Sequence, residues 1–315
     1  MSAQSPTLPS VNPGAPSMKK RKRRKGNWSK FFHHPRAIAG LIILAFFVLL
    51  AILAPVLAPY NPQANIFIPL QPPSWQHLLG TTNTGQDIFS QFVWGAQTTL
   101  MVSLIGGGLS LIIGLLMGMY AGYRGGWIDG LLNSVSNIFL VLPSLALLIV
   151  IESYVKGTSP LIIGMIIGLT GWAFGARVFR SQTMSLANRD FVVAAKLSGM
   201  SDLRIMFGEI LPNMSSIVAT SLMYGCLGAM LAETGLAFLG YEGMSTSSWG
   251  VILYMADGGG AMLSGAWWWF VPPGLAVALV GTSFSLMNFA MDQITNPRLA
   301  NSKRRRKSRV ANSGT

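Results

Sequence analysis

The sequence predicts an all-α polytopic membrane protein with six transmembrane helices, and three observations lead to this prediction. Of its 315 residues, 51% are hydrophobic and 10% are charged, whereas soluble proteins average about 25% charged residues. Six uncharged segments each approach or exceed the roughly 20 apolar residues that a helix needs to cross a bilayer. The basic residues all lie outside these segments. This pattern excludes a soluble domain, and the lone Cys226 excludes both an intrachain disulfide and a cysteine-based metal cluster.

The six expected spans cover residues 37–57, 98–122, 130–151, 158–176, 214–232 and 267–290. The first is interpreted as an uncleaved anchoring helix rather than a secretory signal, because its apolar run exceeds the usual 7–15 residues. Pro143 and the pair Pro272-Pro273 predict kinks or interruptions in the third and sixth spans. Small residues at four-residue spacing predict close helix packing. They are Gly114, Gly118 and Gly122 in the second span, and Gly164 and Gly168 in the fourth.

The distribution of Lys and Arg predicts the orientation of the spans. Placing both termini in the cytoplasm puts 22 of the 23 basic residues on the cytoplasmic side, and Lys156 is the exception. An even number of spans also requires both termini on one side.

The regions outside the spans are predominantly polar. Residues 1–36 are expected to be a disordered basic tail, 58–97 an extracytoplasmic loop and 293–315 a second basic tail. The basic runs at 19–25 and 303–307 resemble nucleic-acid patches, but beside a membrane span they favour attraction to anionic lipid. We therefore expect a lipid partner and no nucleic acid. Trp267, Trp268 and Trp269 are expected to anchor the last span at the outer surface.

Groups that would power transport or bind a cofactor are missing. The phosphate-binding pattern GxxxxGK[ST] does not occur, because the sequence contains no Gly-Lys dipeptide. The acidic residues near the spans, Glu152, Glu233 and Asp292, are interpreted as interfacial. His33, His34 and His77 do not form a metal-ligand pattern. We therefore expect no catalytic, cofactor or metal site, and a transport path that is driven from elsewhere.

A segment between the fourth and fifth spans, residues 186–212, is the most informative part of the sequence. Its residues Phe191, Ala194, Ala195 and Ser198 share one face of a predicted helix. Gly199 is expected to end that helix in a left-handed conformation, with an apolar contact from Met200. Ser201 is the expected N-cap of a second helix, in which Asp202 lies in the first turn. The second helix is predicted to have an apolar stripe and to stop at Pro212. The stripe comprises Leu203, Met206, Phe207 and Ile210.

This helix–glycine–helix segment has two possible roles. It could pack beneath the bundle as an ordinary hairpin, or it could insert its small-residue helix into a groove of a partner protein. The residue pattern by itself leaves both open.

The segment resembles the EAA loop of ABC-importer permeases, specifically the C-type subunits of the oligopeptide/dipeptide/nickel group. Ala194, Ala195, Gly199, Leu211 and Pro212 match that loop at its spacing. Residues 79–100, 231–250 and 296–299 resemble further blocks of the same group in the same order. The sequence departs from the group at several positions. Val193 replaces the name-giving glutamate, Glu209 replaces a basic or histidine residue, and Gln86, Gln91 and Gln97 replace frequent arginines.

The resemblance implies a type I ABC transmembrane domain over residues 98–292, preceded by the anchoring helix, in a bacterial or archaeal cell membrane. It implies a second, related permease subunit, two ABC ATPase subunits and an extracytoplasmic solute-binding protein as partners. The protein itself would be no enzyme and would form half of the path for peptides, with oligosaccharides or nickel as alternative solutes. The alternative class is a stand-alone carrier or channel. The residues implied to couple to the ATPases are Phe191, Ala194, Ala195, Gly199, Met200, Ser201, Asp202, Leu203, Leu211 and Pro212.

Overall fold

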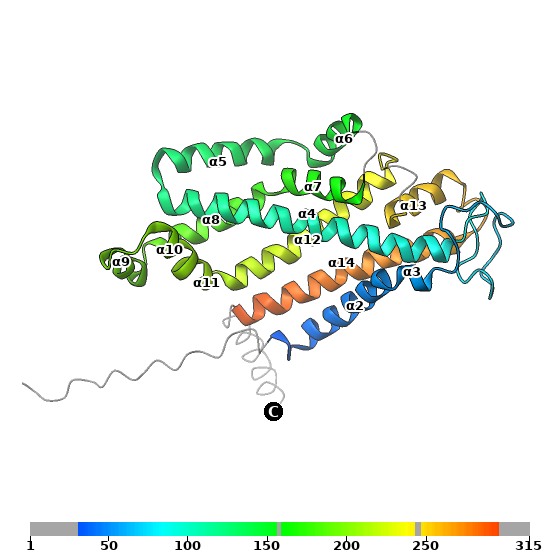
Figure 1. Ribbon diagram of the computed structural model, residues 1–315, viewed down its shortest axis with the longest axis horizontal. Helices are drawn as coiled ribbons and strands as arrows, with labels where there is room; N and C mark the ends of the chain where they lie inside the picture. Colours follow the sequence, from blue (N-terminus) through cyan, green and yellow to red (C-terminus); the bar gives the residue numbers. More distant parts are fainter. Residues whose placement is uncertain (1–30, 156–158, 243–246, 296–315) are drawn as a thin grey trace, which may run out of the picture.

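One long helix organises the structure, a computed structural model that describes residues 31–155, 159–242 and 247–295. This helix, α4 (Ile88–Arg124), runs along most of the bundle (Figure 1). It packs most extensively against α7 (Pro160–Gly171), α8 (Ala173–Ala187) and α12 (Ser215–Phe238). The expected all-helical fold is confirmed for these residues, which hold one isolated bridge, Thr81 with Asp87, as their only β pairing.

The first and last helices of the described chain lie side by side. α2 (Pro35–Ile52) and the short α3 (Ala54–Leu57) continue one another, and α2 packs against α14 (Trp267–Thr295). The main hydrophobic core joins this pair to α4 and to α13 (Trp249–Gly258). Trp249 is fully buried there, and its ring meets that of Phe47 edge to face at 5.4 Å. The anchoring helix is thus an integral part of the bundle.

The two ends of the bundle differ in structure (Figure 1). The loop end carries the irregular segment 58–87 together with α3 and α13. The elbow end carries a chain of short helices between α8 and α12. These are α9 (Asp190–Leu197), α10 (Asp202–Ile205), the π-helix η1 (Met206–Ile210) and α11 (Leu211–Asn213). Residues 190–213 are called the elbow below.

The number of spans agrees with the prediction only if bent helices are counted as single spans. α2, α4, α12 and α14 are each long and apolar enough to cross a membrane. α5 (Gly126–Val141) and α6 (Ser144–Tyr154) meet at 86°, and α7 and α8 meet at 46°. The described chain therefore has four such helices, or up to six spans if each bent pair is one span. Pro143 lies at the sharper bend, where a kink was expected.

Glycines bring α4 close to its neighbours, as their spacing predicted. A methyl group added at Gly122 would lie 2.5 Å from the carbonyl oxygen of Arg180 on α8. At Gly118 it would overlap the carbonyl of Ala176. A methyl group added at Gly168 of α7 would likewise lie 2.7 Å from the Leu109 side chain of α4. Backbone contact of this kind is how small residues hold helices together in lipid.

Several expectations about helix boundaries were wrong. α4 begins at Ile88 rather than near residue 98, so part of the expected loop 58–97 is helical. A further helix, α13, which none of the six expected spans includes, lies between α12 and α14. Pro272 and Pro273 do not interrupt α14, because both lie near its start and the missing N–H groups affect only its first turns. Trp269 is buried in the core instead of anchoring at an interface, whereas Trp267 is exposed.

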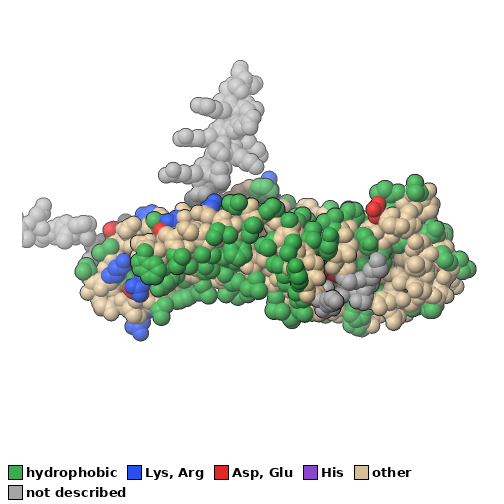
Figure 2. Space-filling view, turned by 90° about the horizontal axis from the view of Figure 1, so that it is seen from above, with side chains coloured by type: hydrophobic (Ala, Val, Ile, Leu, Met, Phe, Trp, Pro, Cys, Tyr) green, Lys and Arg blue, Asp and Glu red, His purple; other side chains and the backbone are tan. Residues whose placement is uncertain are grey.

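Charge and hydrophobicity are segregated on the surface. Hydrophobic side chains cover much of the length of the bundle, and Lys and Arg gather at the elbow end (Figure 2). The described chain has its basic residues at the start of α2, at the end of α4 and on or beside α8, α9 and α10. They are Arg36, Arg124, Arg177, Arg180, Arg189, Lys196 and Arg204. Residues 1–30 and 296–315 of the basic tails and Lys156 lie outside the described residues, whereas the ends of the tails nearest the bundle are helical, since α2 begins at Pro35 and α14 ends at Thr295.

Candidate functional site

The elbow turns at Gly199, which adopts the expected left-handed conformation with φ of 73°. The amide of Gly199 donates to the carbonyl of Lys196 (3.0 Å), and the amide of Met200 donates to the carbonyl of Ala195 (3.2 Å). These two bonds form a Schellman motif, which closes α9 and reverses the chain. Met200 packs against the cluster that contains Ala195, so the predicted apolar contact is confirmed.

The second arm of the elbow is more continuous than expected. Ser201 occupies the N-cap position of α10, but its side chain makes no capping hydrogen bond. The chain then stays helical through α10, η1 and α11, so Pro212 does not stop the helix. The five residues of the π-helix η1 immediately precede Leu211 and Pro212. A wide π turn agrees with a proline here, because Pro212 cannot donate to the carbonyl one turn back and its ring would crowd that carbonyl in a regular helix.

The helix face predicted to contain Phe191, Ala194, Ala195 and Ser198 is exposed except at Ala195. Val192 and Ala195 are the buried residues of α9. Residues 191–195 are all apolar, so the sequence pattern does not indicate which side of α9 faces the bundle. Val192 and Ala195 contact a cluster from α8, α10 and η1. Of the expected stripe in the second arm, Met206 and Ile210 are buried, but Leu203 and Phe207 are exposed.

The tip of the elbow is therefore partly apolar and open. Leu197 is 85% exposed and Leu203 is 64% exposed, on opposite sides of the Gly199 turn. The structure brings together Gly199, Met200, Ser201, Asp202 and Leu203 at this turn. Leu211 and Pro212 lie apart from it, on the far side of η1.

Polar contacts that the sequence analysis missed fasten the elbow to α4. The Tyr123 hydroxyl donates to Asp202 Oδ1 at 3.0 Å, and Arg124 lies 3.2 Å from Asp202 Oδ2. The ammonium group of Lys196 lies over the Tyr123 ring, 4.9 Å from its centre. Both arms of the elbow thus contact the end of α4. The sequence signal that could have indicated these contacts is the pair Tyr123-Arg124, which directly follows the second expected span.

A second ion pair joins the bent helices beside the elbow. The guanidinium group of Arg180 on α8 pairs with the carboxylate of Asp129 on α5, with a second hydrogen bond of 2.6 Å from Nη2. Next to it, Arg177 donates to the Asn137 side chain at 2.7 Å. Two arginines of α8 therefore hold α5, the helix that follows α4.

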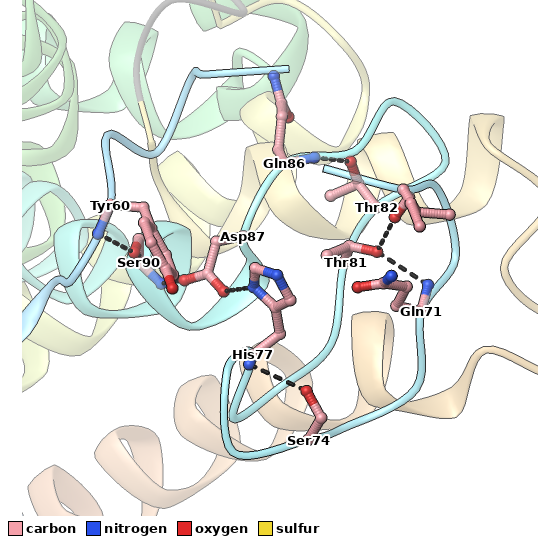
Figure 3. A network of polar contacts seen from close by, with 10 residues as sticks. Tyr60, Gln71, Ser74, His77, Thr81, Thr82, Gln86, Asp87 and Ser90 are labelled. Carbon is pink, nitrogen blue, oxygen red and sulfur yellow. Dashed lines mark hydrogen bonds and ion pairs between the residues drawn. The ribbon is translucent and has the colours of Figure 1, made fainter. Parts of the chain in front are cut away.

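The loop end has its own polar network, drawn in Figure 3. Asp87 is fully buried and caps α4 by accepting from the amide of Ser90 (2.8 Å). Its other oxygen contacts His77 Nδ1 at 2.9 Å, and the ring of His77 packs against those of Tyr60 and Phe67. This network fastens the loop 58–87 to the start of α4. The signal that could have located it is an Asp directly before an apolar helical run.

The acidic residues of the loop end are less exposed than expected. Glu233 is fully buried on α12, within reach of Glu242, and Glu152 of α6 is also buried. Glu242 accepts from the Ser248 hydroxyl at 2.9 Å. The interfacial interpretation of Glu233 and Glu152 stays a prediction, because both residues lie near the ends of α12 and α6 but have buried side chains. Asp292 is exposed near the end of α14, as expected.

Among the residues that the structure describes, no three or more His, Cys, Asp or Glu side chains gather in a way that would hold a metal ion. The glutamines that replace frequent arginines partly satisfy one another, since the Gln91 amide donates to the Gln86 side chain at 2.6 Å.

Comparisons with known proteins identify the family. Residues 114–301 match the family described as "Binding-protein-dependent transport system inner membrane component", and residues 24–73 match "N-terminal TM domain of oligopeptide transport permease C".

Individual relatives cover most of the chain. The oligopeptide transport system permease protein OppC of Mycobacterium tuberculosis is 34% identical over 67% of this chain and 74% of its own length. The di/tripeptide transport system permease protein DppC of Pseudomonas aeruginosa is 32% identical over 87% and 92%. DppC of Bacillus subtilis is 30% identical over 86% and 85%. The chain therefore belongs to the binding-protein-dependent transport system inner membrane components, as a permease subunit of an ABC importer and not an enzyme.

Proposed function

We propose that this subunit forms half of the path of an ATP-driven peptide importer and couples to its ATPases through the elbow. A second permease subunit would supply the other half, two ATPase subunits would bind at the elbow end, and a solute-binding protein would deliver peptide at the loop end. The names of the relatives, which are oligopeptide and dipeptide permeases, support the peptide as solute.

The charge distribution supports an orientation with the elbow end in the cytoplasm. Every Lys and Arg of the described chain lies at the start of α2, at the end of α4 or on the segment from α8 to α10. Cytoplasmic loops of membrane proteins carry such an excess of basic residues. Both termini would then be cytoplasmic, and the loop 58–87 would face outward.

The same orientation assigns the parts of the chain. Residues 1–36 and 293–315 would be basic cytoplasmic tails, and 37–57 would be the anchoring helix. The permease domain would extend to residue 292, with residues 186–212 as its coupling loop. The helix α4, in which the proposed domain boundary at residue 98 falls, begins ten residues before it, at Ile88.

One observation carries the coupling role: the elbow tip is exposed but firmly fastened to the bundle. Leu197 and Leu203 present apolar surface on either side of Gly199, and an apolar helical tip of this kind suits a groove in a partner. Asp202 and Lys196 connect the same tip to the end of α4. A movement of the ATPases would therefore reach the central helix of the permease.

The coupling role is tested by substituting Gly199 in the intact complex. Gly199→Val places a β-branched residue at a positive φ, which should distort the tip without touching its surroundings, because no atom lies within 4 Å of the added Cβ. We expect ATP hydrolysis to persist while peptide uptake into vesicles is lost. Gly130→Val on α5 is the matched control, since its Cβ also meets nothing, its φ is not positive and it lies outside the coupling loop.

Normal uptake by Gly199→Val would contradict the coupling role. Uptake by the isolated subunit without any nucleotide would contradict the proposed function as a whole and favour a stand-alone carrier.

A further inference from the structure

A cavity of about 310 Å³ lies where both bent helix pairs meet α4 and α12. Ser144, the first residue of α6 after the break at Pro143, is one lining residue. Trp172, the residue between α7 and α8, is another. Ser221 and Tyr224 of α12 form part of the opposite wall. The two breaks in the helices thus open onto one shared space.

The break between α7 and α8 falls inside the hydrocarbon layer for an α7 that begins at the membrane surface. α7 has 12 residues, so at 1.5 Å per residue the break lies about 18 Å from its start, within a hydrocarbon layer of about 30 Å. Interrupted helices occur at such depth only where protein covers them or where they line a water-filled space. Ser110 of α4 satisfies one carbonyl at this break by donating to Gly168 (3.1 Å).

Several hydroxyl groups of the cavity wall have no partner within the chain. Among the residues that the structure describes, none hydrogen-bonds to the side chains of Ser144, Ser221 or Tyr224, and Tyr224 is 56% exposed. Thr282 on α14 is different, because it also has an exposed side chain but donates to its own helix at Ala278 (2.8 Å). A hydroxyl facing lipid gains from such internal bonding, whereas one facing water or a polar solute does not need it.

We propose that this cavity is the wall that the subunit contributes to the solute path, where Ser144, Ser221 and Tyr224 contact the main-chain amides of a passing peptide. The inference rests on the proposed function as a peptide importer. Amide groups donate and accept hydrogen bonds, as hydroxyls do. No charged side chain of the described chain lines the cavity, so the wall would contact peptides of different sequence through their shared main chain. A lipid chain, in contrast, would leave the hydroxyls unpaired.

The sole cysteine of the sequence makes the wall accessible to a direct test. Cys226 is buried, so Cys226→Ala leaves this subunit without a cysteine, and labelling of the intact complex is read on this subunit after its subunits are separated. Single cysteines are then introduced as Ser144→Cys and Ser221→Cys, with Thr282→Cys as the matched control. Each complex is treated in vesicles with a charged, water-soluble methanethiosulfonate and, separately, with a lipid-soluble maleimide.

We expect the charged reagent to label Ser144→Cys and Ser221→Cys, to abolish peptide uptake, and to react more slowly when a transported peptide is in excess. Thr282→Cys should react with the lipid-soluble maleimide alone. Labelling of the two wall cysteines by the maleimide alone would place them against lipid, and labelling by neither reagent would place them under the second permease. Labelling by the charged reagent without loss of peptide uptake would show that the cavity contains water but does not belong to the solute path. Each of these three results would overturn the inference and leave the proposed function standing, whereas a parent complex that takes up no peptide would refute the proposed function itself.

A second measurement tests the contribution of the Tyr224 hydroxyl group to uptake. Tyr224→Phe keeps the ring and removes a group that has no partner in the described chain, so the fold should be unaffected. We expect the uptake efficiency, kcat/KM, to fall by about two- to tenfold, as for the loss of one uncharged hydrogen bond. Tyr120→Phe on α4, which does not line the cavity, should leave it unchanged. Equal effects of the two substitutions would overturn the assignment of Tyr224.

Discussion

The Tyr123 hydroxyl on α4 donates a 3.0 Å hydrogen bond to the carboxylate of Asp202 at the start of α10. This bond joins the helix that spans the bundle to the segment proposed to contact the ATPases. Arg124, the last residue of α4, approaches the other oxygen of the same carboxylate at 3.2 Å. Because the start of α4 is fastened to the loop 58–87 by Asp87, one helix connects the two proposed docking ends of the subunit.

The first prediction concerns this connection. Tyr123→Phe combined with Asp202→Asn should reduce the amount of peptide taken up per ATP hydrolysed while leaving hydrolysis itself nearly unchanged. The physical reason is that the elbow loses the Tyr123–Asp202 hydrogen bond and the negative charge facing Arg124, but keeps its buried residues Val192, Ile205 and Ile210. Parallel measurements of ATPase activity and uptake by the reconstituted complex check this ratio.

The cost in stability of the same change should be small. The side chains of Arg124 and Asp202 are 49% and 43% exposed, and an exposed ion pair contributes only about 0–1 kcal/mol. Asp257→Asn on the exposed surface of α13 is the control. An unchanged ratio of uptake to hydrolysis in the double variant would show that α4 does not receive the movement of the elbow through these contacts.

A second prediction concerns the glycines of α4. Gly118→Ala should destabilise the subunit by about 1–3 kcal/mol, because the added methyl group collides with the carbonyl of Ala176 on α8. Gly108→Ala on the same helix meets no atom within 4 Å and should be neutral or stabilising by up to about 1 kcal/mol. The thermal unfolding midpoints of the two variants in detergent test the difference. Equal unfolding midpoints would mean that α4 and α8 move apart to accept the methyl group at Gly118 without a loss of stability.

Local features of this fold could be predicted from the sequence because they depend on single residue types. A glycine between two helical patterns needs no tertiary information to indicate the turn at Gly199. The bend at Pro143 and the close packing at Gly118 follow in the same way from the missing N–H of proline and the missing side chain of glycine. The number of apolar segments similarly predicted the membrane helices.

Features that depend on contacts between distant residues were not predictable. The first turns of α4 contain Ser90 and Gln91, which weakened the hydropathy signal, but each of these side chains donates a hydrogen bond to the loop 58–87. The indole of Trp249, far along the chain, donates to the carbonyl of Phe92 in the same region. Likewise, the choice of Val192 over Phe191 as a buried residue of α9 depends on where α8 and η1 lie. Hydroxyls without partners, such as those of the proposed path, become visible only once the fold is known.

A third prediction concerns the ion pair between α8 and α5. Asp129→Asn should destabilise the subunit by about 1–3 kcal/mol, which is more than an exposed pair costs and less than a fully buried one. The side chains of Arg180 and Asp129 are 27% and 16% exposed, and Asp129→Asn leaves the arginine without its counter-charge. Adding Arg180→Gln to the same chain should recover part of the loss. A double-mutant cycle on thermal unfolding measures the coupling.

Arg177→Gln provides the matched control for this cycle. Arg177 joins the same two helices, but its bond to Asn137 is exposed and its partner is uncharged. We expect a loss of less than about 1 kcal/mol. If Arg177→Gln and Asp129→Asn cost the same, the charge of the Arg180–Asp129 pair contributes nothing beyond an ordinary hydrogen bond.

The last prediction concerns Asp87 at the start of α4. Asp87→Ala removes the cap on the Ser90 amide and the partner of the buried His77 in one step. Losing a helix cap costs about 0.5–2 kcal/mol, and leaving a buried polar group unpaired costs about 1–3 kcal/mol. Asp87→Asn keeps an oxygen for the Ser90 amide and should therefore cost less than Asp87→Ala.

Limited proteolysis distinguishes a loosened loop from a general loss of stability. In Asp87→Ala, cleavage within residues 58–87 should accelerate more than cleavage elsewhere, because the network around His77 fastens that loop to the helix. Asp257→Ala at the same end of the bundle has an exposed side chain and should change stability by no more than about 0.5 kcal/mol. Uniform acceleration across the whole chain would show instead that Asp87 stabilises the bundle generally, and that the loop is held mainly by its apolar contacts through Tyr60 and Phe67.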